Sequence, residues 1–547
     1  MEAEPTTVQV RRRPRFSLRT LLIAFVFLGV VSALYVERLR DYLNDQSRVV
    51  PTGFDLKTGK NILWQTKIGT QSYAGPVVAD GKVFVGTNNQ AGFLERYPSD
   101  VDLGVLLCLN AKDGSLLWQA SSEKLKTGRV HDWPMQGITC TPTIEKDRLY
   151  YVTNRCELVC LDTEGFRDGR DDGVPEPPDI TGVLVEADVV WKLDMMGELN
   201  VSPHNASCSS PCIVDDYVYV VTGNAVDESH INIPSVDAPS FIAVHKKTGR
   251  LIWSDNSPGG NILHGQWGSP IHGVFGRTSQ VIFPGGDGWL YSFDPKGTPD
   301  GKSKLLWKFD CNPKDSVWKL GGSGTRNNVL ATPTIHGGLI YVAMGQDPEH
   351  GEGDGRIWCI DPTKRGDVSP ELVFNNTSGD KMVTRSRTTA CDRDAGDFTR
   401  PNPNSAAVWE YTGTDLDGDG EMAFEETMHR SLSRVVIKND LVFISDLSGL
   451  LHCLDAKQGR AHWIYDLFAQ TWSTPVVSAG YVFAADEDGD VDAFKISSDP
   501  QIAMPSNNPV SNSIADASIY GSPTIQNNVL YLMSRDTVYA IADPTRK

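Results

Sequence analysis

Short apolar runs separated by turn-forming residues recur along the chain from about residue 50 to its C-terminus. Each copy of the pattern holds four runs in which β-branched, aromatic and aliphatic side chains dominate, a composition typical of β-strands. The second run opens with a small residue and proline in seven copies, and Ser433-Arg434 takes that place in the sixth. Leu339 to Val342 exemplifies the third run, and Leu107 to Leu109 the fourth. The pattern predicts a chain built almost wholly of strands.

Eight copies of a four-stranded unit predict an all-β protein, an eight-bladed β-propeller with four-stranded antiparallel blades. In a propeller each twisted sheet buries both faces on its neighbours, so only short edges remain. We therefore expect residues 53–547 to form one domain despite their number.

A tryptophan marks the first run of most copies, and we expect it to dock against a neighbouring blade. The tryptophans in this position are Trp64, Trp118, Trp191, Trp253, Trp307, Trp409 and Trp463. The eighth first run lacks one, and we place it at Gln501 to Met504.

A turn of the form Asx-x-x-x-Gly follows several fourth runs, as in Asn110 to Gly114 and Asp455 to Gly459, and the next tryptophan comes shortly after the glycine. This pattern resembles the tryptophan-docking repeat of the pyrroloquinoline-quinone-like propeller family. That family includes quinoprotein alcohol dehydrogenases and the propeller lipoprotein of the outer-membrane β-barrel assembly machinery. The resemblance covers residues 53–543 and implies the fold, whereas one scaffold hosts unrelated activities.

For the dehydrogenases of that family, the resemblance implies a bound pyrroloquinoline quinone contacted by a disulfide between adjacent cysteines, an aspartate base and a bridging calcium ion. No two of the ten cysteines of this chain are adjacent. Gly288 to Tyr291 resembles a blade motif of the family, although Trp289 is more simply a packing residue. We therefore favour a non-catalytic protein over a quinone-dependent one.

The cysteines follow the repeat. Cys108, Cys160, Cys359 and Cys453 occupy a fourth-run position that alanine or serine fills in the other copies, so we interpret them as small core residues. A disulfide between Cys208 and Cys212 is disfavoured, because an extended pair at this spacing lies about 13 Å apart. Without a Cys-x-x-Cys pair, a structural zinc site is not expected.

The N-terminus has the character of a membrane-targeting leader. Residues 1–20 are basic, and the 16 residues 21–36 form an uncharged apolar run. As a helix this run rises about 24 Å, less than the roughly 30 Å of a hydrocarbon core. It fits a short or tilted transmembrane anchor, or a signal segment that is cleaved near Ala33.

Both interpretations leave the basic end in the cytoplasm. The linker 37–52 and the propeller then lie on the extracytoplasmic, periplasmic side of the cell membrane. We favour an uncleaved single-pass anchor, and the protein is secreted if the leader is cleaved.

The net charge of the chain indicates which partners it can bind. The chain carries 51 basic and 69 acidic residues, a net charge of −18. Such a surface repels phosphate backbones, so no nucleic-acid partner is expected.

A calcium-binding loop is predicted within residues 412–428. Its pattern matches the EF-hand loop, with oxygen ligands at positions 1, 3 and 5, glycine at 6, a backbone carbonyl at 7 and a bidentate glutamate at 12. These ligands are Asp415, Asp417, Asp419, Glu421 and Glu426. The flanks are strands and not helices, so we expect a stabilising loop inserted in the propeller. The alternative is an Asp/Gly-rich surface turn.

Long polar loops join the first run to the second and the third to the fourth. Because strand direction alternates in a blade, these loops share one face of the ring, which we take as the candidate binding face for a protein or small-molecule ligand. Its candidate residues are His131, His204, Asn205, Asp227, Glu228, His230, His264, Trp267, Arg326, Asp347, Glu349 and His350. Each histidine alone is a more plausible hydrogen-bonding residue than a ligand.

Three functions compete. The first is a binding or scaffolding propeller tethered outside the cytoplasmic membrane. The second is an alcohol or sugar dehydrogenase that depends on pyrroloquinoline quinone and calcium. The third is a purely structural surface protein.

Overall fold

The computed structural model describes residues 50–547, apart from 175–176, 178, 321–323, 348, 350–352, 379–380, 384–386, 388, 515–516 and 546–547. The predicted anchor at 21–36 and His350 lie outside the described residues. In the part of the chain that is described, no helix is long and apolar enough to cross a membrane.

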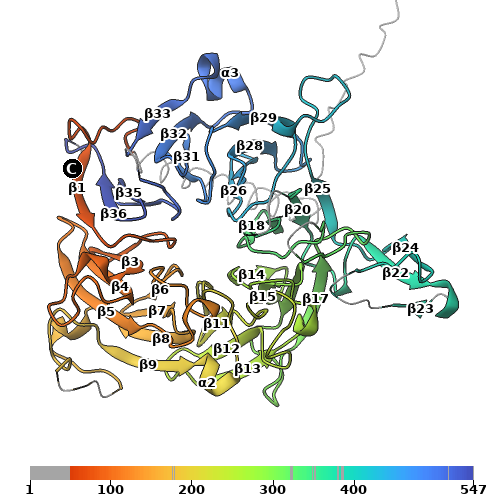
Figure 1. Cartoon of the computed structure of the whole chain (residues 1–547). Helices are drawn as coiled ribbons and strands as arrows, with labels where there is room; N and C mark the ends of the chain where they lie inside the picture. The colour runs from red at the N-terminus through yellow and green to blue at the C-terminus, as the bar shows by residue number, and fades with distance from the viewer. Residues whose placement is uncertain are drawn as a thin grey trace, which may run out of the picture. The chain divides into compact units, whose positions relative to one another are not determined.

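Eight four-stranded antiparallel sheets form a ring, so the predicted eight-bladed propeller is confirmed (Figure 1). We number the blades along the chain. Blade 1 holds β2 (Val77–Ala79), β3 (Lys82–Asn88), β4 (Leu103–Asn110) and β5 (Leu116–Glu123). Blade 2 holds β6 (Thr143–Glu145), β7 (Arg148–Val152), β8 (Glu157–Asp162) and β9 (Val189–Asp194). Blade 3 holds β10 (Cys212–Val214), β11 (Tyr217–Val221), β12 (Phe241–His245) and β13 (Leu251–Asp255). Blade 4 holds β14 (Ile271–Phe275), β15 (Thr278–Pro284), β16 (Trp289–Phe293) and β17 (Leu305–Asp310).

The remaining four blades repeat this arrangement. Blade 5 holds β18 (Thr334–His336), β19 (Leu339–Met344), β20 (Arg356–Ile360) and β25 (Ala407–Tyr411). Blade 6 holds β26 (Val436–Lys438), β27 (Leu441–Ser445), β28 (Leu450–Asp455) and β29 (Ala461–Asp466). Blade 7 holds β30 (Val476–Ser478), β31 (Tyr481–Ala485), β32 (Asp490–Lys495) and β33 (Val510–Ser513). Blade 8 joins β34 (Thr524–Gln526), β35 (Val529–Met533) and β36 (Thr537–Ile541) to β1 (Ile62–Lys67).

The two ends of the described chain close the ring. β1 pairs antiparallel with β36, with Ile62 opposite Ile541 and Lys67 opposite Thr537. The first strand of each sequence repeat, which carries the tryptophan, is therefore the outermost strand of the preceding blade. The boundaries of the sequence repeats and of the blades are thus offset by one strand.

The expected eighth first strand at Gln501 to Met504 is wrong. Helix α3 (Pro500–Ala503) occupies this place, and β33 supplies the outer strand of blade 7. Asp499 accepts a hydrogen bond from the backbone N–H of Gln501, and proline stands at the first helical position. Both features start helices, so local capping outweighs the apolar pattern. A second short helix, α2 (Met195–Leu199), follows β9.

The tryptophans dock against the neighbouring blade, as predicted. All seven are buried, with exposed fractions of 0–9%. In six of them the indole N–H donates to a backbone carbonyl that follows the third strand of the next blade, as from Trp64 to Ala111 and from Trp253 to Pro295. Trp307 instead donates to the amide oxygen of Gln280, whose amide nitrogen donates to the carbonyl of Pro362 in the next blade.

The glycine of the Asx-x-x-x-Gly turn makes this docking possible. A Cβ atom at Gly114 would lie 2.5 Å from the ring of Trp64, and one at Gly459 would lie 2.4 Å from the ring of Trp409. Both glycines also have positive φ, +72° and +68°. The turn therefore needs glycine for its conformation and for the close approach of the ring.

The repeated cysteine position lies in the core, opposite the tryptophan. Cys108 pairs with Trp118 across β4 and β5, and Ala243 pairs with Trp253 at the matching place in blade 3. All ten cysteines are free thiols, Cys208 and Cys212 included.

An insertion leaves blade 5 between β20 and β25. Its first strand, β21 (Gly366–Asp367), adds to the outer edge of blade 4 in parallel with β17. A separate three-stranded sheet follows, made of β22 (Glu371–Asn375), β23 (Lys381–Met382) and β24 (Asp397–Pro401). This sheet projects from the side of the ring (Figure 1). The insertion continues to the candidate binding face, which we call the long-loop face because it carries the long loops after the first and third strands of the sequence repeat. There Thr389 forms a β-bridge with Val317.

Candidate functional site

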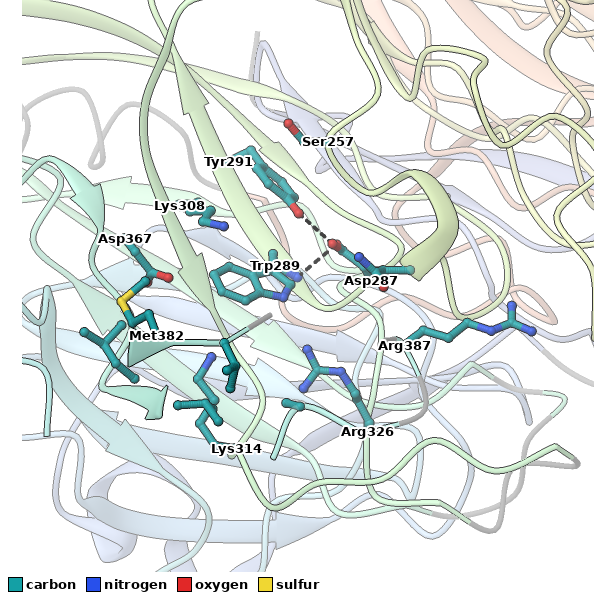
Figure 2. Close-up of a pocket in the computed structure, with 15 residues that line it drawn as sticks. Ser257, Asp287, Trp289, Tyr291, Lys308, Lys314, Arg326, Asp367, Met382 and Arg387 are labelled. Atoms are coloured by element: carbon teal, nitrogen blue, oxygen red, sulfur yellow. Dashed lines mark hydrogen bonds between the residues drawn. The ribbon is translucent and has the colours of Figure 1, made fainter. Parts of the chain in front are cut away.

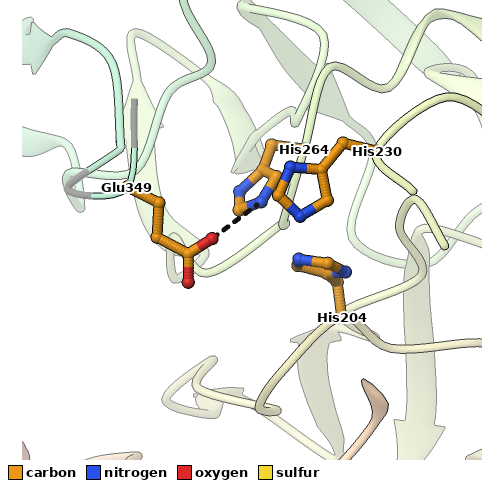
Figure 3. A group of neighbouring side chains, drawn as sticks. All are labelled: His204, His230, His264 and Glu349. Atoms are coloured by element: carbon orange, nitrogen blue, oxygen red, sulfur yellow. Dashed lines mark ion pairs between the residues drawn. The ribbon is translucent and has the colours of Figure 1, made fainter. Parts of the chain in front are cut away.

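Four separate loops bring three histidines and one glutamate together on the long-loop face. Each offers one ligand atom, and these atoms all lie within 4.8 Å of one another. We call this group the histidine cluster; it consists of His204, His230, His264 and Glu349. Figure 3 shows the three imidazoles around a common space with the carboxylate of Glu349 at one side.

The imidazoles contact one another directly. Their ring centroids lie 4.4 Å apart for His204 and His264, and 4.8 Å apart for each pair with His230. His204 and His264 are buried, whereas His230 is half-buried and Glu349 is exposed. The cluster is thus deep on its imidazole side and reaches solvent on its carboxylate side.

Polar groups lie behind the cluster. Nδ1 of His204 lies 3.1 Å from the carbonyl oxygen of Val226, and Nδ1 of His264 lies 3.3 Å from Oδ2 of the buried Asp347. The amide of Asn205 donates to Oε1 of Glu349 at 2.9 Å. Oε2 of Glu349 lies 3.6 Å from Nε2 of His264.

The other predicted face residues surround or support these loops. His131 contacts the hydroxyl of Ser202 through Nε2, at 3.3 Å, and burial lowers its pKa. Trp267 packs edge-on against His264, with ring centroids 5.5 Å apart. Glu228 forms an exposed ion pair with Arg129.

Asp227 stabilises its own loop. Its carboxylate accepts hydrogen bonds from the side chains of Ser229 and Asn232. The Ser229 hydroxyl makes the largest contribution to lowering the pKa of Asp227 to about 2. This residue therefore orders the loop that presents His230.

A pocket lies beside the histidine cluster, between blade 4 and the insertion. We call it the rim pocket, and its volume is about 260 Å³. It is lined by Ser257, Asn261, Asp287, Trp289, Tyr291, Lys308, Lys314, Arg326, Asp367, Leu372, Val373, Met382, Val383, Arg387 and Ala390 (Figure 2). Arg326 also lines a small cleft that contains His264 and Asp347, so the two features share a wall.

An aromatic ring between cations forms the centre of the rim pocket. Trp289 lies between Lys308 and Lys314 in Figure 2, and their ammonium nitrogens lie 4.7 and 4.5 Å from the centroid of its ring. Such contacts stabilise a cation by about 0.5–2 kcal/mol, depending on how far it is desolvated. They hold both ammonium groups at the pocket without neutralising them.

One buried carboxylate sets the positions of two pocket cations. Asp310 is 0% exposed and lies 2.6 Å from Nζ of Lys314 and 3.2 Å from the guanidinium of Arg326. Burial acts to raise the pKa of Asp310, but the charges of Arg326 and Lys314 outweigh it and lower the pKa. Two cations thus share one anion.

Asp287 is a second buried carboxylate at the pocket wall. Burial raises its pKa to about 6, against the opposing effect of a hydrogen bond from Tyr291. The Tyr291 hydroxyl donates to Oδ2 of Asp287 at 2.6 Å. Near pH 6 this carboxylate therefore changes charge inside the pocket.

Arg387 fastens the insertion to the long-loop face. Its guanidinium donates to the carbonyl of Ile262 at 3.0 Å and to that of Ile231, and it stacks 4.5 Å over the ring of Trp318. Burial lowers its pKa.

Sequence reasoning named Arg326 but missed the rest of the rim pocket. Lys308 lies on β17, whose sequence shows only the pattern of the blade repeat. Arg387 lies in the insertion between β20 and β25, which starts from the face opposite the long loops. The sequence signal that pointed to this pocket was Trp289, which lies in a blade motif that resembles the family's. The sequence pattern alone favours a packing role for this residue.

The predicted calcium loop has the backbone of a closed Asp/Gly loop. Oxygens of Asp415, Asp417 and Asp419 lie within 4.8 Å of one another. The carboxylate of Asp415 accepts from the backbone N–H groups of Gly418 and Gly420, at 2.7 and 3.0 Å. An isolated bridge between Gly413 and Thr427 closes the base of the loop.

Glu426 faces the same loop but is engaged with the backbone. Its carboxylate accepts from the N–H groups of Leu416, Asp417 and Ala423, and the first of these bonds makes the largest contribution to lowering its pKa. The residues present therefore fit a calcium site in which Glu426 would exchange backbone donors for the ion. The backbone carbonyl of Glu421, expected from the sequence as the seventh-position ligand, stays a prediction.

The chain does not provide the cysteine contact of the quinone dehydrogenases. That contact needs a disulfide between adjacent cysteines, whereas no cysteines of this chain are adjacent and all ten are free thiols.

Comparison with known proteins gives matches to this propeller class. The family model described as outer membrane protein assembly factor BamB matches residues 46–170 and 402–499. The polyvinylalcohol dehydrogenase of Sphingopyxis sp. (strain 113P3) is 32% identical over 126 residues, which cover 22% of this chain and 18% of that relative's length.

Two solved structures are also similar. The structure of BamB from Moraxella catarrhalis has 13% identity and a TM-score of 0.48, covering 88% of this chain and 97% of the other. The computationally designed Ika8 protein has 9% identity and a TM-score of 0.48, covering 88% and 99%. The histidine cluster and the rim pocket lie in residues 171–401, between the two stretches that the family model matches.

Proposed function

Because the chain carries the pyrroloquinoline-quinone-like propeller repeat, we propose that it works as a binding module that captures a carboxylate-bearing ligand in the rim pocket. The observation that carries this proposal is the charge of the pocket. Four cationic side chains and two carboxylates line it, in a chain whose net charge is −18. A cationic recess on an anionic surface attracts anions and orients them by charge-assisted hydrogen bonds.

The geometry favours a ligand with more than one anionic group. Lys308 and Arg387 come from opposite walls, blade 4 and the insertion, and Lys314 and Arg326 add a third contact region that Asp310 neutralises only in part. A volume of about 260 Å³ suits a small organic acid or the acidic side chains of a protein segment. These two sources share the carboxylate chemistry, and a binding assay can separate them.

Titration calorimetry on the full-length protein in detergent tests the proposal, with citrate and a triglutamate peptide as probes. Lys308→Gln removes one charge and should weaken binding of the better probe by about tenfold, the value of one hydrogen bond to a charged group. Lys302→Gln is the matched control, because Lys302 is an exposed lysine of the same blade that lies outside the pocket.

The uncharged trimethyl ester of citrate controls for apolar binding. Equal binding of the ester and of citrate, or equal binding of citrate by wild type and Lys308→Gln, would refute a carboxylate site. Preference for triglutamate would assign the pocket to a protein partner, in line with the assembly-factor model that matches part of the chain.

For localisation, we propose that residues 21–36 anchor the propeller to the cell membrane on its extracytoplasmic, periplasmic side. The basic residues before an apolar run support this orientation. Protease treatment of intact and of permeabilised spheroplasts tests it. Degradation of the propeller in intact spheroplasts is expected, and protection until permeabilisation would place the propeller in the cytoplasm.

We further propose that the loop 412–428 binds one calcium ion through Asp415, Asp417, Asp419 and Glu426. Three clustered carboxylates and a fourth at position 12 supply the hard oxygen ligands that calcium takes, and the ion would hold the loop against blade 6. Loss of high-affinity calcium uptake in Asp415→Ala with Glu426→Gln tests this site.

The second candidate is a pyrroloquinoline-quinone-dependent dehydrogenase, favoured by the match to polyvinylalcohol dehydrogenase. The cysteine pattern described above disfavours it. Incubation with pyrroloquinoline quinone and calcium, followed by a dye-reduction assay with alcohols, sugars and polyvinyl alcohol, separates the two candidates. Turnover would establish the enzyme, and the binding module predicts none.

A further inference from the structure

The histidine cluster combines four metal-ligating side chains with the outer groups that metal sites require. We propose that it binds one divalent transition-metal ion, with zinc as the ion that suits it best. This inference is independent of the rim pocket, because none of the four cluster residues lines that pocket.

The surroundings of two imidazoles favour the tautomers that a metal needs. A carbonyl oxygen beside Nδ1 of His204 and a carboxylate oxygen beside Nδ1 of His264 favour a proton on each Nδ1. Each Nε2 then carries the lone pair that binds a cation. Metal-bound histidines almost always have such a partner on the second nitrogen, which orients the ring and raises its basicity.

The carboxylate is oriented in the same way. Asn205 donates to one oxygen of Glu349, and the other oxygen faces Nε2 of His264 at 3.6 Å. Around a tetrahedral zinc ion with bonds of about 2.0–2.1 Å, neighbouring ligand atoms lie about 3.3 Å apart. The present upper limit of 4.8 Å requires side-chain shifts of only about 1 Å to reach that geometry.

The donor set selects the class of ion. Three imidazoles and one carboxylate suit zinc and its neighbours in the first transition row, whereas calcium and magnesium prefer oxygen ligands. Binding uses the neutral form of each imidazole, whose Nε2 carries the lone pair. The exposed Glu349 marks the route of entry.

The four ligands also explain the length of their loops. They come from the connections after β9, β11, β13 and β19, which belong to blades 2, 3 and 5. A shared ion would tie these blades together at the long-loop face. The absence of Cys-x-x-Cys pairs has no bearing on this site, since its ligands are far apart in sequence and contain no cysteine.

The test uses full-length protein stripped with a chelator and titrated with zinc against a chromophoric competitor. To exclude the loop 412–428, every variant carries Asp415→Ala and Glu426→Gln. The protein with only these two substitutions, called the background protein, should bind one zinc ion. His230→Asn keeps a residue that tolerates the positive φ of 61° at this position but removes the imidazole. It should weaken binding more than about 100-fold, since loss of an outer partner alone costs about 10–100-fold.

Two further variants make the test specific. Asp347→Asn removes the carboxylate behind His264 and should weaken zinc binding by about 10–100-fold without removing a ligand. His462→Ala removes an exposed histidine of blade 6 and should leave binding unchanged. Circular dichroism confirms that each variant is folded.

Cobalt substitution identifies the ligands independently. Cobalt held by nitrogen and oxygen should give visible ligand-field bands without the intense near-ultraviolet absorption of thiolate ligation. The proposal is overturned if the background protein binds no zinc, if His230→Asn binds it as tightly as the background, or if the cobalt spectrum shows thiolate ligands.

Discussion

Blades 3 and 5 differ from blades 6 and 7 in the connection between their second and third strands. In blades 6 and 7 this connection has four residues, 446–449 and 486–489, whereas in blades 3 and 5 it spans 222–240 and 345–355. The short turns are closed by one aspartate, as when Asp446 accepts from the N–H groups of Ser448 and Leu450. The long loops carry His230 and Glu349.

The sheets beneath these loops are the same. Cys359 faces Trp409 in blade 5, Cys453 faces Trp463 in blade 6, and both tryptophans donate to a carbonyl of the next blade. The tryptophan docking that holds the blades together is therefore the same whether the loop above the sheet is long or short. The family model matches residues 46–170 and 402–499 and leaves out 171–401, where the histidine cluster and the rim pocket lie.

The largest expected effect tests the shared scaffold. Trp253→Ala removes a ring that is 1% exposed and donates to Pro295, and it should lower the free energy of unfolding by about 3–5 kcal/mol. Denaturant titration measures this. Phe468→Ala, at a position that is 83% exposed, is the control and should change stability by less than about 0.5 kcal/mol. Equal losses in the two variants would show that tryptophan docking does not hold the blades together.

The next effect tests whether the polar region depends on its own buried charges. Asp310→Ala leaves Lys314 and Arg326 buried without their common anion, and it should cost about 3 kcal/mol. Asp300→Ala breaks an exposed ion pair with Lys302 and should cost well under 1 kcal/mol. If Asp310→Ala is as stable as wild type, the rim pocket is not organised by this residue.

The fold was largely predictable from the sequence, because the propeller signal is repeated. Seven tryptophans and a fourth-strand position restricted to small residues report the same packing contact in successive copies. The prediction was wrong at residues 501–504, where no tryptophan marks the strand and the Asp499-Pro500 cap starts a helix.

The site was less predictable, because it is made of contacts between distant residues. Alternating strand direction placed His204, His230 and His264 on one face, but no sequence spacing reports that their rings lie within 5 Å. Arg387 is harder still, since the insertion must cross the edge of blade 4 before it reaches Ile262.

A third prediction concerns the proposed calcium loop, which lies in the connection between β25 and β26, before blade 6. At a free calcium concentration 100 times Kd, opening of the loop should become about 2.7 kcal/mol more costly. Hydrogen exchange at the amides of Gly418 and Gly420 should slow about 100-fold in consequence. In Asp415→Ala with Glu426→Gln calcium should have no effect. Equal slowing in this variant would move the ion elsewhere, and magnesium serves as the matched ion control.

The smallest expected effect is the pH dependence that Asp287 gives to the polar region. Its pKa rises from an ordinary value of 3.8 to about 6 in the folded protein, chiefly through burial, so the folded state binds the proton more tightly than the unfolded state. The stabilisation from protonation is complete below about pH 3.8 and is lost as the pH rises through about 6. Asp287→Asn keeps an acceptor for the Tyr291 hydroxyl but cannot ionise. Relative to this variant, wild type should therefore lose about 2 kcal/mol of stability between pH 4 and pH 7. Urea titrations of both proteins across that range measure the difference, which cancels the contributions of the other carboxylates. Parallel stability curves would show that Asp287 is ionised throughout and that the pocket holds its charge independently of pH.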